Sequence, residues 1–149
     1  MFRLNRLTDY GVVVLTQLCL SEGLSSAQQI ANRTGVPVPT VAKVLNLLTR
    51  ASLVQSHRGA TGGYSLTRPA EDIAVSEIIQ ALEGPVALTA CVENAEGNCG
   101  VEAICPMRGG WEKVNRAIQD ALGSVTLAEM IGGAMPLSPS AGSTAEAAT

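Results

Sequence analysis

The sequence predicts a mainly α-helical protein, and two observations support this fold class. Hydrophobic residues make up 46% of the 149 residues but aromatic residues only 3%. An aliphatic core of this kind suits packed helices better than a sheet sandwich. Apolar side chains also recur at the spacing of an amphipathic helix in several segments. A domain near this size buries about 68–70% of its unfolded surface, so it needs no disulfides to fold.

The first helix is expected over roughly 8–21. Thr8 is a plausible N-cap, and Asp9 is a favourable charge in the first turn. Cys19 lies on the apolar stripe of this helix. We expect it to be a small core residue, because unpaired cysteines are among the most buried residue types.

Two further helices are predicted, joined by a tight turn. Ser25 or Ser26 can cap a short helix, and Gly35 stands just past its end. Pro39 suits the first turn of the next helix, which runs to about Ala51. Its inward face is expected to hold Val41, Val44, Leu45 and Leu48, and its outward face Thr40, Lys43, Asn46 and Arg50. This arrangement is a helix-turn-helix.

A β-hairpin is predicted directly after these helices. Residues 53–56 and 64–67 have the pattern of strands, and residues 58–63 form a glycine-rich turn. The rival interpretation is a phosphate-binding loop, but no Gly-Lys-Ser/Thr sequence follows. A hairpin in this place is the wing of a winged helix-turn-helix.

A fourth helix, over about 75–82, and a long helix starting near Pro106 or Arg108 are predicted next. The long helix carries an apolar stripe of Trp111, Val114, Ile118, Ala121 and Leu122. Such a helix after a winged module serves to dimerise it; the alternative is a helix folded back on its own domain. Residues 126–131 form one further helical turn.

The chain is expected to divide into three parts. Residues 1–84 form the DNA-binding region, and residues 85–131 form a cysteine loop and the dimerisation helix. Residues 132–149 consist mainly of Gly, Ala, Ser, Pro and Thr, and we expect this tail to be disordered because it has little apolar surface to bury.

The charges are divided unevenly along the chain. Residues 1–70 carry a net charge of +5 and residues 71–149 a net charge of −8. A basic half predicts a face that binds a polyanion, with chance surface charge as the alternative. No apolar run approaches the roughly 18 residues of a membrane span. We expect a cytoplasmic protein with no membrane partner, since no small-x-small cleavage site follows the weakly apolar start.

Three of the four cysteines are clustered as Cys91-x7-Cys99-x5-Cys105. Thiolates in an irregular segment can converge on a metal, and in a reducing compartment clustered cysteines favour metal or redox chemistry. The spacing differs from the C-x2-C pairs of zinc ribbons and from the runs of ferredoxins. The alternative is three unrelated cysteines.

Taken together, these motifs resemble those of the Rrf-type winged helix-turn-helix regulators. The matching segments are Leu4–Gly11, Val36–Leu45, Ser56–Leu66 and the three cysteines. The family includes IscR-like and NsrR-like proteins, and the likeness is closest to the regulators of the SUF iron–sulfur assembly system. It covers about residues 2–131.

The resemblance implies a homodimer whose Cys91, Cys99 and Cys105 bind an iron–sulfur cluster, more often [2Fe–2S] than [4Fe–4S]. In IscR-like members a histidine stands where this chain has Arg108, which is a poor ligand. In NsrR-like members an acidic residue of the partner's first helix is the fourth ligand, and Asp9 matches it. Asp9 is equally explained as a helix-terminal charge, and Glu102 or an external thiol are further candidates.

The resemblance also implies which residues contact double-stranded promoter DNA. Pro39, Thr40 and Lys43 match contact positions of the recognition helix, and Arg58 matches the wing arginine. Arg50 joins them as an exposed cation. His57, at the wing, is interpreted as a residue near a phosphate or a structural residue.

The predicted function is therefore a regulator that senses an iron–sulfur cluster and represses SUF genes. The alternative is a nitric-oxide or redox sensor on the same scaffold. The wing argues against an electron-transfer or cluster-carrier protein, because such a protein needs no wing. An enzyme is not expected, because the sequence shows no catalytic motif and its single histidine limits acid–base chemistry.

Overall fold

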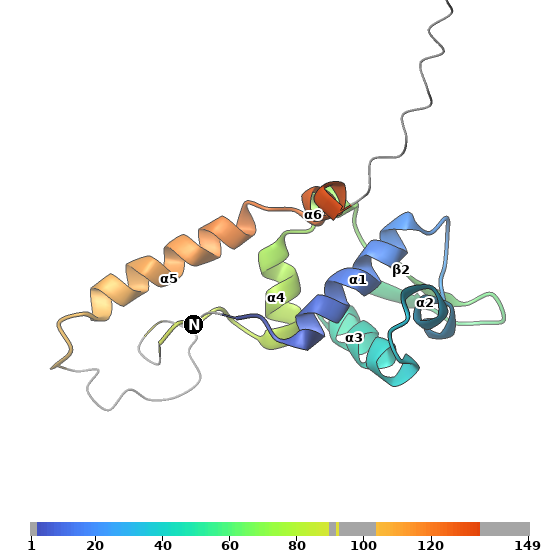
Figure 1. Cartoon of the computed structure of the whole chain (residues 1–149), viewed down its shortest axis with the longest axis horizontal. Coiled ribbons are helices and arrows are strands. Elements are labelled where there is room, and N and C mark those ends of the chain that lie inside the picture. Colours follow the sequence, from blue (N-terminus) through green and yellow to red (C-terminus); the bar gives the residue numbers. More distant parts are fainter. Residues whose placement is uncertain (1–2, 90–91, 93–103, 135–149) are drawn as a thin grey trace, which may run out of the picture.

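The computed structural model describes residues 3–89, 92 and 104–134. Its elements are α1 (Arg6–Leu20), α2 (Ala27–Thr34), α3 (Val38–Arg50), β1 (Val54–His57), β2 (Gly63–Leu66), the 3-10 turn η1 (Ala70–Asp72), α4 (Val75–Glu83), α5 (Arg108–Gly123) and α6 (Leu127–Ala134). Figure 1 shows α1–α4, α6 and the hairpin gathered together, with α5 extending beside them as an arm. The predicted fold class, mainly helical with a two-stranded wing, is confirmed.

Helix α1 begins before its predicted start, and Thr8 is not its N-cap. The side chain of Asn5 accepts a hydrogen bond from the Thr8 amide at 3.1 Å, so Asn5 is the cap. Thr8 lies inside the helix, is only 2% exposed, and donates its hydroxyl proton to the Glu83 carboxylate at the end of α4. A capping side chain three residues upstream therefore moves the helix start to Arg6.

The prediction that Cys19 belongs to the core is wrong, because this side chain is exposed. The buried face of α1 is formed by Thr8, Gly11, Val14, Leu15 and Leu18. Cys19 lies at the edge of that face and is the penultimate residue of the helix. It therefore borders solvent although it follows the apolar spacing.

The helix-turn-helix forms as the sequence predicts. The Ser26 hydroxyl accepts from the Gln29 amide, and the Gln29 side chain accepts from the Ser26 amide, which completes a capping box. Gly35 ends α2 with φ +76°, a conformation that favours glycine. Pro39 lies in the first turn of α3, and Val41, Val44, Leu45 and Leu48 are all buried.

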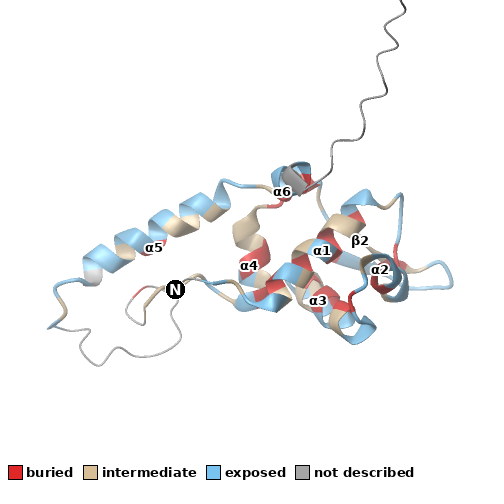
Figure 2. Cartoon of the chain, viewed as in Figure 1, coloured by how far each residue is buried: buried red, intermediate tan, exposed pale blue. Residues whose placement is uncertain are grey.

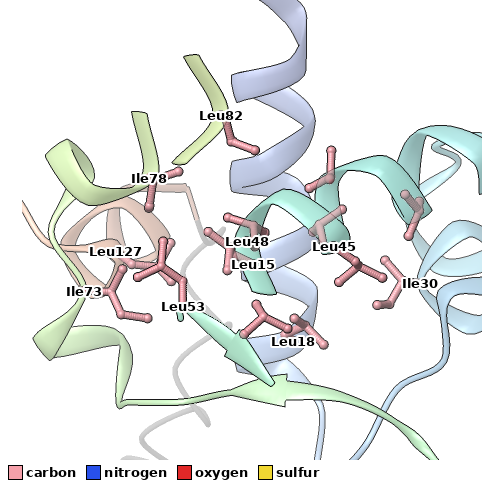
Figure 3. Packing of buried hydrophobic residues seen from close by; sticks show 14 of the residues in the cluster. Leu15, Leu18, Ile30, Leu45, Leu48, Leu53, Ile73, Ile78, Leu82 and Leu127 are labelled. Carbon is pink, nitrogen blue, oxygen red and sulfur yellow. The ribbon is translucent and has the colours of Figure 1, made fainter. Parts of the chain in front are cut away.

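The core is aliphatic and includes α6, the last helix of the described residues. Leucine and isoleucine side chains from α1, α3 and α4 meet there (Figure 3). Leu127 and Ile131 bring α6 into the same cluster, and the Leu127 amide donates to the Ile73 carbonyl at 2.8 Å. Helix α6 runs to Ala134, further than predicted and past the start of the predicted tail; residues 135–149 lie outside the described residues.

Helix α5 has a different environment from the other helices. Of its described side chains only Asn115 is buried (Figure 2). Trp111 and Val114, on the predicted apolar stripe, are 41% and 45% exposed. The first part of this stripe is therefore not covered by the described core, whereas Ile118 and Leu122 further along it are half-buried. Within the described part of the chain, no helix is both long and apolar enough to span a membrane.

Candidate nucleic-acid interface and cysteine segment

Helix α3 presents a polar face to solvent while its apolar face is held from behind. It packs against α1 and α2, so the N-terminal half of α3 is fixed at the surface. Pro39, Lys43 and Arg50 are exposed, and Thr40 is half-buried. A helix held in this way presents its first turns to a major groove, as the second helix of a helix-turn-helix does.

The wing is a two-stranded antiparallel hairpin that presents Arg58. Strand β1 pairs with β2 in a register that sets Val54 opposite Leu66 and His57 opposite Gly63. The Gly62 amide donates to the Gly59 carbonyl at 3.0 Å, and Gly59 has φ +120°. Arg58 is exposed at the start of this turn, beside the exposed His57, whose Nε2 lies 3.3 Å from the Ser65 hydroxyl.

The wing is tied to the helix-turn-helix through the loop before α2. Ser25 and Tyr64 exchange two backbone hydrogen bonds, of 3.1 and 2.8 Å. A Cβ on Gly63 would lie 2.8 Å from the Ser25 carbonyl carbon, so only glycine allows this approach. Because Ser26 caps α2, the wing and the helix-turn-helix are connected at this point into one continuous surface.

Within the described residues, the cations on this surface form no ion pair with a carboxylate. Among the described residues the one ion pair joins Arg68 to Glu77 at 2.9 Å, away from Lys43 and Arg58. Lys43, Arg50 and Arg58 make no side-chain hydrogen bond or ion pair within that part of the chain. Unpaired cations on an exposed face are suited to phosphates, which supply sequence-independent affinity for DNA.

Glu77 supports the helix that follows the wing. Partial burial acts to raise the pKa of this carboxyl, but hydrogen bonds from the Ala74 amide and from Arg68 outweigh it and lower the pKa. The ionised carboxylate therefore caps the first turn of α4 and holds Arg68, whose guanidinium also donates to the Asp72 carbonyl. Arg68 is thus a structural cation.

The predicted cluster ligands are only partly within the described residues. Cys105 is half-buried and lies three residues before α5, whereas Cys91 and Cys99 lie outside the described residues. Asp9 is exposed in the first turn of α1 and makes no side-chain hydrogen bond or ion pair with the described residues. In that part of the chain no group of three or more His, Cys, Asp or Glu side chains could hold a metal ion. Three soft thiolates are suitable donors for iron, so the prediction of a cluster rests on the sequence.

Sequence reasoning missed two polar residues near the start of the cysteine segment, which comprises residues 86–108. Glu83, the last residue of α4, accepts hydrogen bonds from the Asn5 amide and the Thr8 hydroxyl. Asn115 is 2% exposed, accepts from the Leu88 amide and donates to the Val86 carbonyl, both at 3.0 Å. A signal for Asn115 existed, because it falls four residues after Trp111 within the apolar stripe.

Comparison with known proteins decides the family. The model of the Rrf2 family, described as an iron-dependent transcriptional regulator, matches residues 4–133. This chain belongs to the Rrf2 family. The match extends from before α1 into α6, so it includes the helix-turn-helix, the wing and the long helix.

Individual Rrf2-type relatives agree over most of their length. An HTH-type transcriptional regulator of Neisseria meningitidis serogroup A is 34% identical over 131 residues, which is 87% of each protein. The structure of T. potens IscR is 33% identical, with a TM-score of 0.63 over 90% of this chain and 89% of that one. CymR, the global cysteine regulator of B. subtilis, is 27% identical, with a TM-score of 0.67 over 89% and 98%. The protein is therefore a winged-helix transcriptional regulator, and its family is one of regulators rather than enzymes.

Proposed function

We propose that this Rrf2 regulator senses an iron–sulfur cluster and represses SUF iron–sulfur assembly genes in the cytoplasm. The observation that carries the proposal is the set of Cys91, Cys99 and Cys105 in a chain whose family is described as iron-dependent. Cysteine thiolates are the usual protein ligands of such clusters, and [2Fe–2S] is the form we expect.

Promoter DNA is the proposed partner of the exposed α3 and wing. Lys43 and Arg58 supply the direct contacts, because Pro39 and Thr40 offer few hydrogen bonds to base edges. Arg50 lies seven residues after Lys43, about 10 Å further along α3, and is suited to a phosphate at the groove edge. The preference for one operator then depends partly on DNA shape.

The active form is proposed to be a homodimer joined through α5. Trp111 and Val114 remain substantially exposed in the single chain, and a second copy of the same stripe would cover them. A two-fold dimer presents two α3 helices to two half-sites of a palindromic operator.

The fourth ligand is proposed to be Asp9 of the other subunit. Its carboxylate is exposed and has no partner in its own chain among the described residues, which leaves it available to a group on the other subunit. When bound, the cluster would supply a centre that responds to iron and sulfur supply or to oxidants. Residues 86–108 would then change arrangement with the state of the site and shift the dimer between DNA-binding states.

A purified sample tests the cluster. Protein prepared without oxygen should be coloured and contain iron and acid-labile sulfide. Cys91→Ala, Cys99→Ala and Cys105→Ala should each abolish the colour, while Cys19→Ala, which changes an exposed thiol of α1, should leave it intact. A colourless wild-type protein, or one that contains only zinc, would contradict the proposal.

The absence of histidine at Arg108 also favours the sensing of nitric oxide on the same scaffold. Nitric oxide added to the coloured protein would then abolish promoter binding at stoichiometric amounts. A cluster that reacts with nitric oxide no faster than with air would exclude this second candidate.

A further inference from the structure

Asn115 makes a two-point contact with the backbone that leads into the cysteine segment. Its Oδ1 accepts from the Leu88 amide and its Nδ2 donates to the Val86 carbonyl, each at 3.0 Å. Gln119, one turn later, donates to the same Val86 carbonyl at 3.2 Å. The side chain thus binds one donor and one acceptor of the same short backbone stretch, and its burial reduces the competition of water.

This contact fixes the start of the segment relative to its end. Leu88 is held by Asn115, and the segment ends where α5 begins at Arg108, seven residues before Asn115. Along a helix this separation is about 10 Å. Cys91 follows the held Leu88 by three residues, and Cys105 precedes α5 by three. Asn115 therefore links the backbone just before Cys91 to the helix that begins just after Cys105. The stretch between these two points carries all three clustered cysteines.

Helix α5 has a second attachment at its other end. The Val75 amide donates to the Val125 carbonyl at 2.9 Å, and Ala74 forms an isolated β-bridge with Thr126. Between the two attachments α5 packs against α4, and an open pocket of about 300 Å³, lined in part by Gln80, Pro85 and Gln119, lies beside this contact. Because α5 is held at these two places, a change at the Asn115 contact alters its direction about the C-terminal attachment.

We propose that Asn115 is a positioning residue that couples the arrangement of the cysteine segment to the direction of α5. The inference rests on the proposed function, because it assigns the path by which the state of the cysteine segment reaches the dimer. In this proposal, a rearrangement of that segment displaces residues 86–88. This displacement shifts Asn115 through its two hydrogen bonds, and α5 shifts with Asn115. In a dimer joined through α5, a change in its direction alters the spacing of the two α3 helices.

Amide hydrogen exchange of the full-length protein tests this coupling. The samples are wild type, Asn115→Ala, Asn115→Asp and Gln119→Ala, with Lys113→Ala as a control on the exposed face of the same helix. Each is measured without cluster and after anaerobic reconstitution with iron and sulfide. Asn115→Asp keeps the acceptor for Leu88 but loses the donor to Val86, whereas Asn115→Ala loses both.

In the cluster-free protein we expect Leu88 to exchange about tenfold faster in Asn115→Ala, because its hydrogen-bond partner is gone. Asn115→Asp should keep Leu88 protected, and Gln119→Ala should change little. A general weakening of α5 would affect Asn115→Ala and Asn115→Asp alike, so equal exchange at Leu88 in these two variants would overturn the inference.

Reconstitution supplies the second readout. In wild type and Lys113→Ala the exchange of residues 108–115 should change together with that of residues 86–88, whereas in Asn115→Ala residues 108–115 should no longer respond. An equal response of α5 in wild type and Asn115→Ala would overturn the inference while leaving the cluster in place. If the wild type takes up no cluster, the proposed function fails and, with it, the role assigned to Asn115, even where the exchange at Leu88 confirms the contact itself.

Discussion

The carboxylate of Glu83 accepts a hydrogen bond from the hydroxyl of Thr8, which joins the end of α4 to the start of α1. The same oxygen accepts from the Asn5 amide at 2.9 Å. Asn5 in turn caps α1, so one carboxylate fixes both the helix start and its cap. Because Asp9 follows Thr8 directly, this contact also positions the proposed fourth ligand.

Loss of the Glu83 carboxylate should destabilise the fold. Glu83→Ala leaves the buried Thr8 hydroxyl with only the long 3.5 Å contact to the Asn5 side chain, and the loss of its main acceptor costs about 1–3 kcal/mol. Equilibrium denaturation by urea measures this change. Glu22→Ala, which removes an exposed carboxylate just beyond the other end of α1, should change the free energy of unfolding by less than about 0.5 kcal/mol. Similar values for the two variants would show that the Glu83 contact contributes nothing.

Glu77 should contribute to the loss of stability in acid. Its pKa is lower in the fold than the ordinary value of 4.5, so the folded state favours the ionised form. This contribution is complete above pH 4.5 and disappears as the pH falls through the lower pKa of the folded state.

Glu77→Gln should therefore have a melting temperature that falls less steeply than that of wild type as the pH drops below 4.5. Glu71→Gln, which changes an exposed carboxylate in η1, should follow the wild-type slope. Parallel curves for wild type and Glu77→Gln would contradict the assigned role.

The recognition surface should depend on Lys43 and Arg58. Lys43→Ala or Arg58→Ala should weaken binding to a palindromic promoter fragment by about 1–3 kcal/mol where the lost contact reads a base. Fluorescence anisotropy at several salt concentrations measures this affinity, which should fall as salt rises because phosphate contacts release counterions.

Arg116→Ala is the matched control, since it removes an exposed cation from α5 outside the winged module. It should bind like wild type at each salt concentration. If Lys43→Ala and Arg58→Ala also bound like wild type, α3 and the wing would not be the DNA-binding surface.

The local elements could be predicted because their signals lie close together in the sequence. Ser26 with Gln29 and Gly35 bound α2, and the glycine-rich turn separates the two strands of the wing. The start of α1 could not be placed from Thr8, because the capping side chain is Asn5 and the partner of the Thr8 hydroxyl is 75 residues away. Long-range hydrogen bonds leave no periodic signal.

Which individual residues of a helix are buried was equally hard to predict. Cys19 follows the apolar spacing of α1 but is exposed, since the helix ends one residue later. Asn115 interrupts an apolar stripe and is nevertheless the one buried residue among the described side chains of α5, because it binds backbone groups of Val86 and Leu88. Leu127 and Ile131 return to the core after α5, which no local pattern indicates.

Asp9 should affect the cluster without affecting the fold. Asp9→Ala should retain the wild-type circular dichroism spectrum, since this exposed side chain makes no hydrogen bond or ion pair within the described part of the chain. Its cluster should be lost faster in air or show a changed absorption spectrum, because a ligand is missing. Glu22→Ala should retain the wild-type cluster. Unchanged spectrum, stability and switching in Asp9→Ala would make Asp9 a helix-terminal charge only.

In the proposed function, the state of the cysteine segment controls promoter binding. The most direct test is the dissociation constant for one promoter fragment, measured anaerobically on the same preparation before and after removal of the cluster. We predict that the two constants differ by about tenfold or more, a typical allosteric coupling, and that Cys99→Ala binds like the cluster-free form. Equal constants for a preparation shown to contain iron and sulfide would contradict the account.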